Sequence, residues 1–595
     1  MKQHNSRLLP LGISAIIVVG VLLGSFYSNH FSSQHVSFIN TTSNKISDLL
    51  HIIDERYVDT INLPDFVERA LPQILKELDP HSTYISAKDV EASMQDLKGS
   101  FSGIGIRFTI YEDTVRVVNV ISGGPSEAVG LRAGDRIVSV DNKPYVGKVV
   151  TNEETAKRLK GPSKSVVKVG VKRNGEPRIL NFEIVRNAVP VKSIDAAYML
   201  DQETGYMRIT TWGDNTYPEF LAAMASLHSN GLKSLVIDLR GNLGGYLQAA
   251  VQVANEFLPR NTLIVYNEGR HFPREDYKSD GRGSYPSMPL VVLVDETSAS
   301  ASEIFAGAMQ DNDRAMIIGR RTFGKGLVQV PIEFRDGSML RLTTARYYTP
   351  SGRSVQKPFV PGHDEDYEAD LLERAVTGEY FSSDSIKTTG KAYKTSIGRT
   401  VYGGGGIIPD VFIPRDTLGI TNYYKEVYLN GTLHQFAYYF VDNHREKLSS
   451  LTSPVEVAKY LKQKDVVGQL ANYAAKHGIQ RRNLMIEQSR KLLEQHIISS
   501  VLIDLFDVQA AVEYGNATDE FVKNALHLMR NNEATPKLNQ TKASKAVASV
   551  PSHDKKGNSI YRSAAQTSIA LRESTDTRQW TVARVFAKVR RILLG

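Results

Sequence analysis

The sequence predicts a multidomain protein of the α+β class. Its 595 residues leave room for three or four domains, and 41% hydrophobic with 23% charged residues is the composition of a chain that can build globular cores. A continuous apolar run over 289–294 indicates a buried strand. In 43–97 and 423–530, by contrast, apolar residues recur at the spacing of amphipathic helices. We therefore expect helical units near both ends of the chain and strand-rich units between them.

An apolar segment stands close to the N-terminus. Leu8 to Tyr27 contains no charged residue and follows Lys2 and Arg7, which fits a bilayer span with a cytoplasmic N-terminus. A cleaved signal peptide is the main alternative, although the run is longer than a usual signal core and 24–27 is a poor cleavage site. A buried helix of the fold is the third. We expect 1–30 to be a membrane anchor, with the body of the chain exported to the periplasmic side of the cell envelope.

Composition excludes several functions. The chain has no cysteine, so a disulfide, a thiol nucleophile and a Cys-ligated metal are impossible, and no motif implies a metal or a cofactor. In the tail, 535–595, twelve Lys and Arg stand against three Asp and Glu, which accounts for the net charge of +8. We therefore expect no nucleic-acid partner. Most of this tail is predicted to be disordered, and an apolar face over 580–593 fits either an anionic membrane or packing on the core.

The stretch Thr297–Gln329 carries the candidate chemistry. After the strand, small residues lead into a helical pattern, which places Ser300 or Ser302 near a helix N-terminus, where free N–H groups and the helix dipole favour negative charge. Lys325 follows between two glycines. Alone, the serine turn fits a helix cap, and the lysine fits a solvated loop cation. Together they are what a Ser/Lys hydrolase requires.

Three motifs carry a resemblance to a known family. TSASASEIFAGAMQDNDRA, GRRTFGKGLVQ and RLTTARYYTPSGRSVQ resemble the carboxy-terminal processing proteases, or tail-specific proteases, which are serine peptidases of the S41 family. The resemblance runs from about Asn44 to Asp410. It implies a helical unit over 43–98 and an α/β peptidase core over 191–416. A charged insertion at about 357–399, which we interpret as lying on the surface, departs from the simplest family pattern.

The resemblance also implies the roles of the catalytic residues. The nucleophile is Ser300, the general base is Lys325, and Gln329 orients the lysine. A neutral lysine requires burial and the absence of a close carboxylate, which lower its pKa from about 10.4. Ser298 lies in the same turn as Ser300. We expect Ser302 to cap the helix and Glu303 to suit the positive end of the helix dipole.

A glycine turn is expected to complete the site. The sequence Leu-Arg-Gly-Asn-Leu-Gly-Gly follows a predicted strand, and adjacent glycines let backbone amides approach a ligand. The resemblance implies that Gly244 and Gly245 form half of an oxyanion hole, with the amide of Ala301 as the other half.

A second resemblance covers 99–190. The segment GGPSEAVGLRAGDRIVSVD resembles a PDZ domain, whose glycine-rich loop binds a peptide's terminal carboxylate while the peptide adds a strand to a sheet edge. By position, Ile104, Gly105 and Ile106 would bind the carboxylate; a tight turn into a strand is the alternative for this loop. The expected partners are therefore proteins or peptides with accessible C-termini.

Other functions stay open from the sequence. A Ser–His–Asp triad would have His228 or His271 as its histidine, although neither belongs to a motif, and His81 is expected to be structural. A catalytically inactive PDZ scaffold is the alternative from another class, against which the presence of both Ser300 and Lys325 argues. The helical region 417–534 would dock on the core or mediate homo-oligomerisation.

Overall fold

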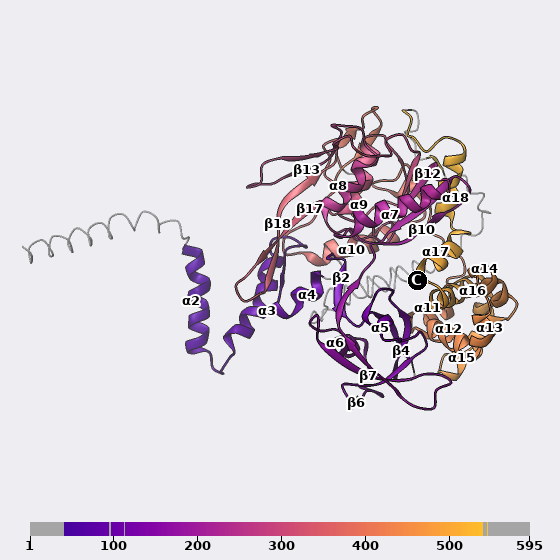
Figure 1. The fold of residues 1–595 in the computed structure, drawn as a ribbon. Helices are drawn as coiled ribbons and strands as arrows, with labels where there is room; N and C mark the ends of the chain where they lie inside the picture. Colours follow the sequence, from indigo (N-terminus) through magenta and orange to yellow (C-terminus); the bar gives the residue numbers. More distant parts are fainter. Residues whose placement is uncertain (1–40, 95–96, 112, 389, 539–543, 546–595) are drawn as a thin grey trace, which may run out of the picture. The chain divides into compact units, whose positions relative to one another are not determined.

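The computed structural model describes residues 41–94, 97–111, 113–388, 390–538 and 544–545 (Figure 1). The predicted membrane segment and most of the basic tail lie outside these residues. Within the described part of the chain, no helix combines the length and the apolarity needed to cross a bilayer.

The chain divides into two units, 1–75 and 76–595. The described part of the first contains α2 (Thr41–Arg56) and most of α3 (Leu63–Lys76), as the periodicity predicts. The second begins with β1 (Thr83–Ile85) and α4 (Ala87–Met94), and the short strand β1 was not expected.

The segment 100–190 forms a small β-rich domain. Its sheet has the order β3-β4-β5-β7-β8, with β6 on β5, while β2 pairs with β9 and closes the ends of the segment. The elements are β2 (Ser100–Gly103), β3 (Ile106–Tyr111), β4 (Thr114–Val120), α5 (Pro125–Ala128), β5 (Arg136–Val140), β6 (Lys143–Pro144), α6 (Asn152–Leu159), β7 (Val166–Lys172), β8 (Leu180–Val185) and β9 (Asn187–Pro190).

The central domain is built on a sheet of order β10-β11-β12-β15-β16-β21-β22. β10 and β11 are antiparallel, and the other neighbours are parallel. The strands are β10 (Ile194–Met199), β11 (Thr204–Ile209), β12 (Ser234–Asp238), β15 (Leu290–Val294), β16 (Met316–Gly319), β21 (Val411–Phe412) and β22 (Ser544–Lys545). Buried strands of a parallel sheet are apolar on both faces, which explains the continuous runs in the sequence.

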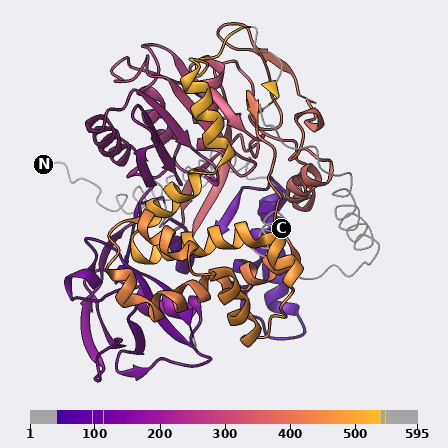
Figure 2. The same cartoon turned by 90° about the vertical axis from the view of Figure 1, so that its right-hand side faces the viewer.

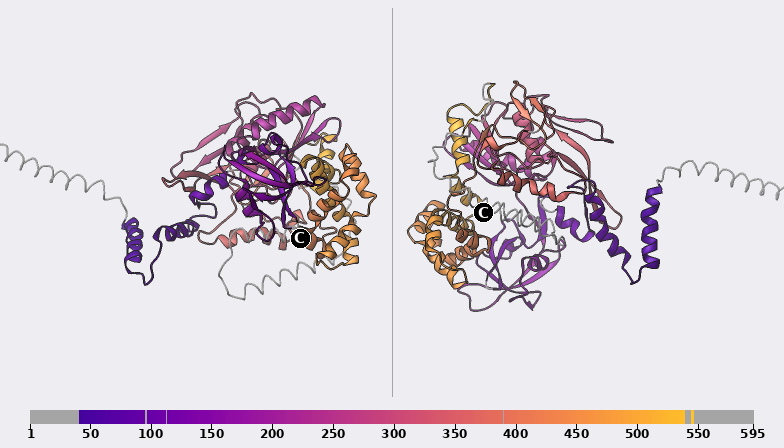
Figure 3. Two further views of the ribbon diagram at one scale, coloured as in Figure 1. Left: turned by 60° about the horizontal axis from the view of Figure 1, so that its bottom comes forward. Right: turned by 180° about the vertical axis from the view of Figure 1, so that it is seen from behind.

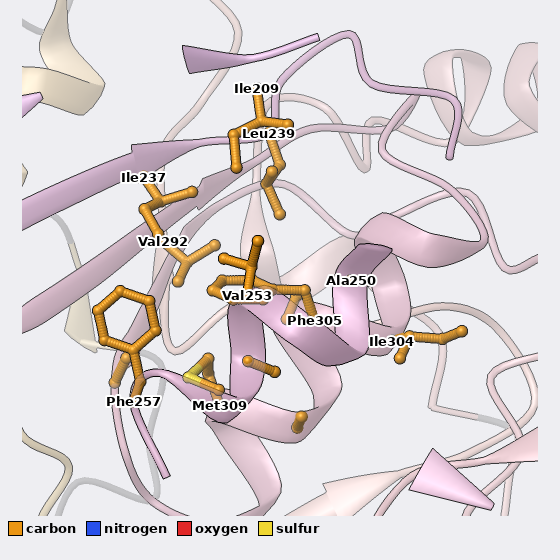
Figure 4. Packing of buried hydrophobic residues seen from close by; sticks show 14 of the residues in the cluster. Ile209, Ile237, Leu239, Ala250, Val253, Phe257, Val292, Ile304, Phe305 and Met309 are labelled. Carbon is orange, nitrogen blue, oxygen red and sulfur yellow. The ribbon is translucent and has the colours of Figure 1, made fainter. Parts of the chain in front are cut away.

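Helices cover both faces of this sheet. On one face α7 (Thr216–Ser229), α8 (Leu247–Asn255) and α9 (Ala301–Asp311) bury Phe257, Phe305 and Met309 against Ile237 and Val292 (Figure 4). On the other face, Val236, Val291 and Leu293 pack with residues of α18. The sheet is therefore a rigid base for the turns at the ends of β12 and β15.

The described part of the chain contains a second, separate sheet. Its order is β1-β18-β13-β14, and β17 also pairs with β18. The strands are β13 (Leu263–Glu268), β14 (Glu275–Lys278), β17 (Leu327–Glu333) and β18 (Met339–Tyr348). Because β1 pairs with β18, the segment 83–85 joins the sheet that follows the lysine loop.

The insertion is not confined to the surface. It contains α10 (Asp364–Val376), a 3-10 turn (Ser383–Ser385) and β19 (Ala392–Lys394), which pairs with β20 (Thr400–Tyr402) directly after it. Its charged residues Lys357, Arg374, Glu379 and Arg399 are buried. Its charge suggested a solvated segment because burying an unpaired charge is costly. Here carboxylate partners offset that cost, as in the Arg321–Glu379 and Arg399–Asp313 ion pairs.

The C-terminal region is helical, as predicted. Figures 2 and 3 show its orange helices gathered into one bundle. The bundle consists of α11 (Asn422–Leu429), α12 (Thr432–Asn443), α13 (Arg445–Ser449), α14 (Pro454–Lys462), α15 (Val466–Lys476), α16 (Asn483–Leu505) and α17 (Val508–Asn516). The last helix, α18 (Glu520–Arg530), packs on the central sheet instead. The α+β class is confirmed.

Candidate active site

The turn between β15 and α9 holds Ser300 in a strained conformation. Ser300 is the residue before the helix, with φ 55° and ψ −115°. A non-glycine residue there costs on the order of 1–3 kcal/mol, and such strain occurs where a hydroxyl must be exposed at a strand-to-helix turn. Gly244 lies directly against this turn, because a Cβ on Gly244 would stand 2.7 Å from the Cβ of Ser300.

The three serines of the turn have different surroundings. The Ser298 hydroxyl donates to the carbonyl of Leu239 at 2.8 Å, and Ser298 is fully buried. The Ser302 hydroxyl accepts from the indole of Trp212 at 3.0 Å and is also buried. The expectation that Ser302 caps the helix is wrong, because Ser300 holds the cap position and Ser302 already faces the core. Ser300 alone of the three is partly exposed.

The carboxylate of Glu303 connects the serine turn to the lysine loop. Glu303 is fully buried, and its carboxylate accepts the backbone N–H of Ser300 at 2.9 Å and that of Lys325 at 2.8 Å. It also accepts the N–H of Gly324 and the hydroxyl of Thr322. Burial raises the pKa of Glu303, while these four donors favour its ionised form. Sequence reasoning predicted only that this glutamate suits the helix dipole.

The loop 322–326 has no regular structure, yet its backbone is fully hydrogen-bonded. Besides the bonds to Glu303, the N–H groups of Thr322, Phe323 and Gly326 donate to Ile407, Ser298 and the Gln356 side chain. Arg374 donates to the first two carbonyls of the loop, and the backbone N–H of Lys357 donates to the third. The hydroxyl and the backbone N–H of Tyr347 donate to the last two. Because a buried backbone group without a partner is costly, this complete pairing fixes the position of Lys325.

The surroundings of Lys325 lower its pKa. Burial is the largest cause and the cation of Arg341 acts in the same direction, whereas the carboxylates of Asp79 and Glu303 act against them. Two carboxylates therefore act on the lysine, but burial outweighs both. Among the described residues, no hydrogen bond joins the Ser300 hydroxyl to the Lys325 amine, and catalytic hydrogen bonds often tighten only when substrate binds.

Gln329 connects β17, the strand that follows Lys325, to residues 79–81. Its side-chain amide donates to the Thr343 hydroxyl at 3.2 Å, which donates to Asp79 at 3.0 Å. Asp79 also accepts the backbone N–H of His81 at 2.8 Å, and the His81 imidazole shares a hydrogen bond with the Tyr367 hydroxyl. Burial, followed by the charge of Lys325, lowers the pKa of His81 to about 3.

The glycine turn presents one free amide. Gly244 and Gly245 have φ of 108° and 146°, which other residues rarely adopt. The N–H of Gly244 donates to the Asn242 side chain at 2.9 Å. Within the described chain, no hydrogen bond uses the N–H of Gly245 or Ala301. These two amides, rather than that of Gly244, are therefore available to an oxyanion.

The β-rich domain has the geometry of a peptide site. β3 follows directly after Gly105 and lies at the edge of its sheet, where β4 is its one partner among the described strands. Ile104 is buried, and its carbonyl accepts the N–H of Ser126 at 2.9 Å. Gly105 has φ 77° and packs against Gly124, so the loop turns tightly into β3. An exposed strand edge of this kind can accept an added strand.

Family models match three parts of the chain. Residues 203–369 match Peptidase family S41, 102–184 match the PDZ domain, and 423–507 match a family of unknown function, DUF8443. The carboxy-terminal-processing protease of Bartonella bacilliformis is 35% identical over 316 residues, which are 52% of this chain and 72% of the relative. This chain is an S41 peptidase of the carboxy-terminal processing type.

A second relative agrees with the assignment. A probable CtpA-like serine protease of Staphylococcus aureus is 32% identical over 362 residues, covering 60% of this chain and 71% of the relative. Among solved structures, the photosystem II D1 C-terminal processing protease is 29% identical, with a TM-score of 0.30 over 53% of this chain and 91% of the other. The predicted resemblances to S41 peptidases and PDZ domains are confirmed.

In this S41 peptidase, a histidine-based triad has no support. His228 is exposed on α7 and stacks on Tyr285, and His271 is exposed between β13 and β14. Among the described residues, neither histidine has a hydrogen bond with Ser300. Lys325, by contrast, is connected to the serine turn, because Glu303 accepts the backbone N–H of both Ser300 and Lys325.

Proposed function

We propose that this S41 peptidase cleaves protein substrates with Ser300 as the nucleophile and Lys325 as the general base. The Ser300 oxygen bonds to the scissile carbonyl carbon while the neutral Lys325 amine takes the hydroxyl proton. The amides of Ala301 and Gly245 stabilise the oxyanion. The intermediate then expels the amine of the C-terminal fragment, which receives the proton from Lys325. Water then attacks the acyl-enzyme carbonyl and gives a proton to Lys325. The second intermediate breaks its bond to Ser300, which takes this proton from Lys325, and the N-terminal fragment leaves with a new C-terminal carboxyl group.

The connection through Glu303 is the observation that carries this proposal. The same carboxylate binds the backbone N–H of Ser300 and of Lys325, which supports the assignment of both residues to one site. The neighbouring serines already spend their hydroxyls on buried partners. A lysine with a lowered pKa is a suitable base near neutral pH. We assign Gln329 the role of holding this region through Thr343.

We further propose that the PDZ domain selects substrates by their free C-termini. The terminal carboxylate would accept the amides of the loop 104–106, and the peptide would pair with the open edge of β3. The tight Gly105 turn supports this role, since an added Cβ would meet Gly124 at 3.2 Å. The PDZ domain takes no part in the chemistry.

We also retain the prediction that residues 8–27 anchor the protein in the membrane, with the catalytic body on the periplasmic side of the cell envelope. Release of the full-length protein from membranes by salt alone would contradict it. Self-association through the helical C-terminal region stays a prediction, to be checked by the mass of the protein in solution.

Cleavage of an unstructured protein with an apolar C-terminus tests the proposed chemistry. We expect the wild type to degrade it and Lys325→Ala to be inactive, with both variants folded. Lys233→Ala is the control, because it changes an exposed lysine directly before β12 of the same domain. If Lys325→Ala cleaves as well as the wild type, the proposed base is wrong. Binding without cleavage by the wild type would favour a PDZ scaffold.

A further inference from the structure

The insertion contacts the lysine loop through a buried arginine. Arg374 on α10 is 2% exposed. Its guanidinium donates to the carbonyl of Thr322 at 2.8 Å and to that of Phe323 at 3.2 Å, and it pairs with Asp370 at 3.0 Å. These two carbonyls directly precede Gly324 and Lys325. Two of the five carbonyls of the loop therefore depend on this one arginine.

Aromatic rings join the same helix to the loop. Tyr367 on α10 is buried, and its ring meets that of Phe323 edge to face, with centroids 5.9 Å apart. The ammonium of Lys357 lies 4.2 Å from the Phe323 ring centroid and 4.0 Å from that of Tyr367, and it donates to the Tyr367 carbonyl. The Lys357 backbone N–H also donates to the carbonyl of Gly324 at 2.9 Å. The start of the insertion and α10 thus hold one side of the loop.

The hydroxyl of Tyr367 extends these contacts to His81. It lies 2.9 Å from Nε2 of His81, and the two rings meet edge to face. The backbone N–H of His81 donates to the carboxylate of Asp79, which also accepts the hydroxyl of Thr343. The Thr343 hydroxyl in turn accepts the side-chain amide of Gln329. The chain of contacts from α10 therefore returns to the strand that follows the lysine.

We propose that α10 is a positioning element for the catalytic base, in which Arg374 fixes the backbone before Lys325 and Tyr367 fixes His81 in the series of hydrogen bonds that leads to Gln329. This inference rests on the proposed role of Lys325. Neither residue touches the substrate or the reacting atoms. A displacement of about 1 Å in a catalytic group can cost roughly 100-fold in rate, so a loosened loop lowers turnover more than substrate affinity.

The charged groups around Lys325 determine how the variants respond to pH. They are Arg341 on β18, Glu303 on α9 and Asp79 upstream of β1. His81, whose pKa is lowered to about 3, is neutral above that pH and adds no charge. Without the Tyr367 hydroxyl, the His81 imidazole loses its hydrogen-bond partner, and we expect water to reach the Lys325 amine more easily. Water weakens the desolvation that lowers the pKa of Lys325, so this pKa rises. Because neutral Lys325 is the active form, the acidic limb of the rate profile moves to higher pH.

Tyr367→Phe is the main test, because it removes one oxygen and keeps the ring. We expect kcat to fall roughly 10- to 100-fold with KM nearly unchanged, and the acidic limb to move to higher pH. The matched control is Tyr393→Phe in β19 of the same insertion, which should behave as the wild type. An unchanged kcat and pH profile in Tyr367→Phe would overturn the proposal, as would a loss explained entirely by the unfolded fraction.

Chemical rescue of Arg374→Ala provides a second readout. If this variant folds, added guanidinium should restore part of kcat, since the ion can bind the two carbonyls that Arg374 leaves. A folded variant with wild-type kcat would contradict the proposal, and if it does not fold, Tyr367→Phe still decides. Failure of the inference differs from failure of the proposed function. In the first case Lys325→Ala is inactive while Tyr367→Phe has wild-type activity, and in the second Lys325→Ala is active.

Discussion

The buried carboxylate of Glu303 accepts the backbone N–H of Lys325 at 2.8 Å, and the same carboxylate accepts the N–H of Ser300. The serine belongs to a turn after β15 and the lysine to an irregular loop before β17. Neither element would by itself define the distance to the other. One charged side chain in the first turn of α9 therefore connects the backbones of the proposed nucleophile and the proposed base.

Replacing Glu303 should disconnect the two loops. In Glu303→Gln an amide NH₂ replaces an acceptor oxygen and faces backbone donors. We expect kcat/KM to fall about 100-fold or more and the free energy of unfolding to drop by roughly 2 kcal/mol, from N–H groups left without acceptors. Steady-state kinetics and chemical denaturation check both effects. Glu333→Gln, at an exposed position of β17, is the control, and wild-type kinetics in Glu303→Gln would show that the connection is dispensable.

The space at Gly244 gives a second prediction. In Gly244→Ala the new methyl group would stand 2.7 Å from the Ser300 Cβ and 2.8 Å from the Ala299 carbonyl oxygen, so the serine turn must shift and cleavage should be lost. Gly241→Ala is a matched control in the same turn, with φ 77° and no atom within 4 Å of the added carbon. It should cost only backbone strain, about 1–2 kcal/mol, and keep its activity. Equal rates for the two variants would rule out this steric account.

The pH dependence of cleavage should respond to Arg341. Activity requires neutral Lys325, so kcat/KM rises as pH increases through the pKa of this lysine, which lies below its ordinary value. The Arg341 cation helps to lower that pKa. In Arg341→Gln the pKa rises, and the acidic limb should move to higher pH. Arg346→Gln, an exposed change on the same strand, should leave the profile in place. Movement of the limb to lower pH in Arg341→Gln would contradict the assignment of Lys325 as the base.

Blocking the substrate's C-terminus tests the PDZ proposal. Amidation removes the charge that the loop 104–106 is proposed to bind but leaves every peptide bond intact. We expect the amidated substrate to be cleaved more slowly through a higher KM. A short peptide that is too small to reach both sites serves as control and should be cleaved equally in both forms. Equal kinetics for the free and amidated forms of the long substrate would refute selection by the carboxylate.

Sequence reasoning identified the catalytic candidates but not their connections. Ser300 and Lys325 stand in long motifs, so the sequence alone singled them out. The role of Glu303 was missed, because helix-dipole reasoning places a glutamate at a helix start without revealing which distant amides it binds. The occupied amide of Gly244 was missed too, since the partner, the Asn242 side chain, depends on turn geometry. Charge patterning placed the insertion on the surface because a sequence does not show which charges find buried partners.

Labelling with a serine-reactive probe, followed by peptide mapping, tests the central assignment most directly. The account predicts a label on Ser300 in the wild type, because its hydroxyl is partly exposed while those of Ser298 and Ser302 are buried. It also predicts that the label is lost in a folded Lys325→Ala variant, since no base then activates the serine. A label on Ser298 or Ser302, or undiminished labelling of Ser300 without Lys325, would contradict it.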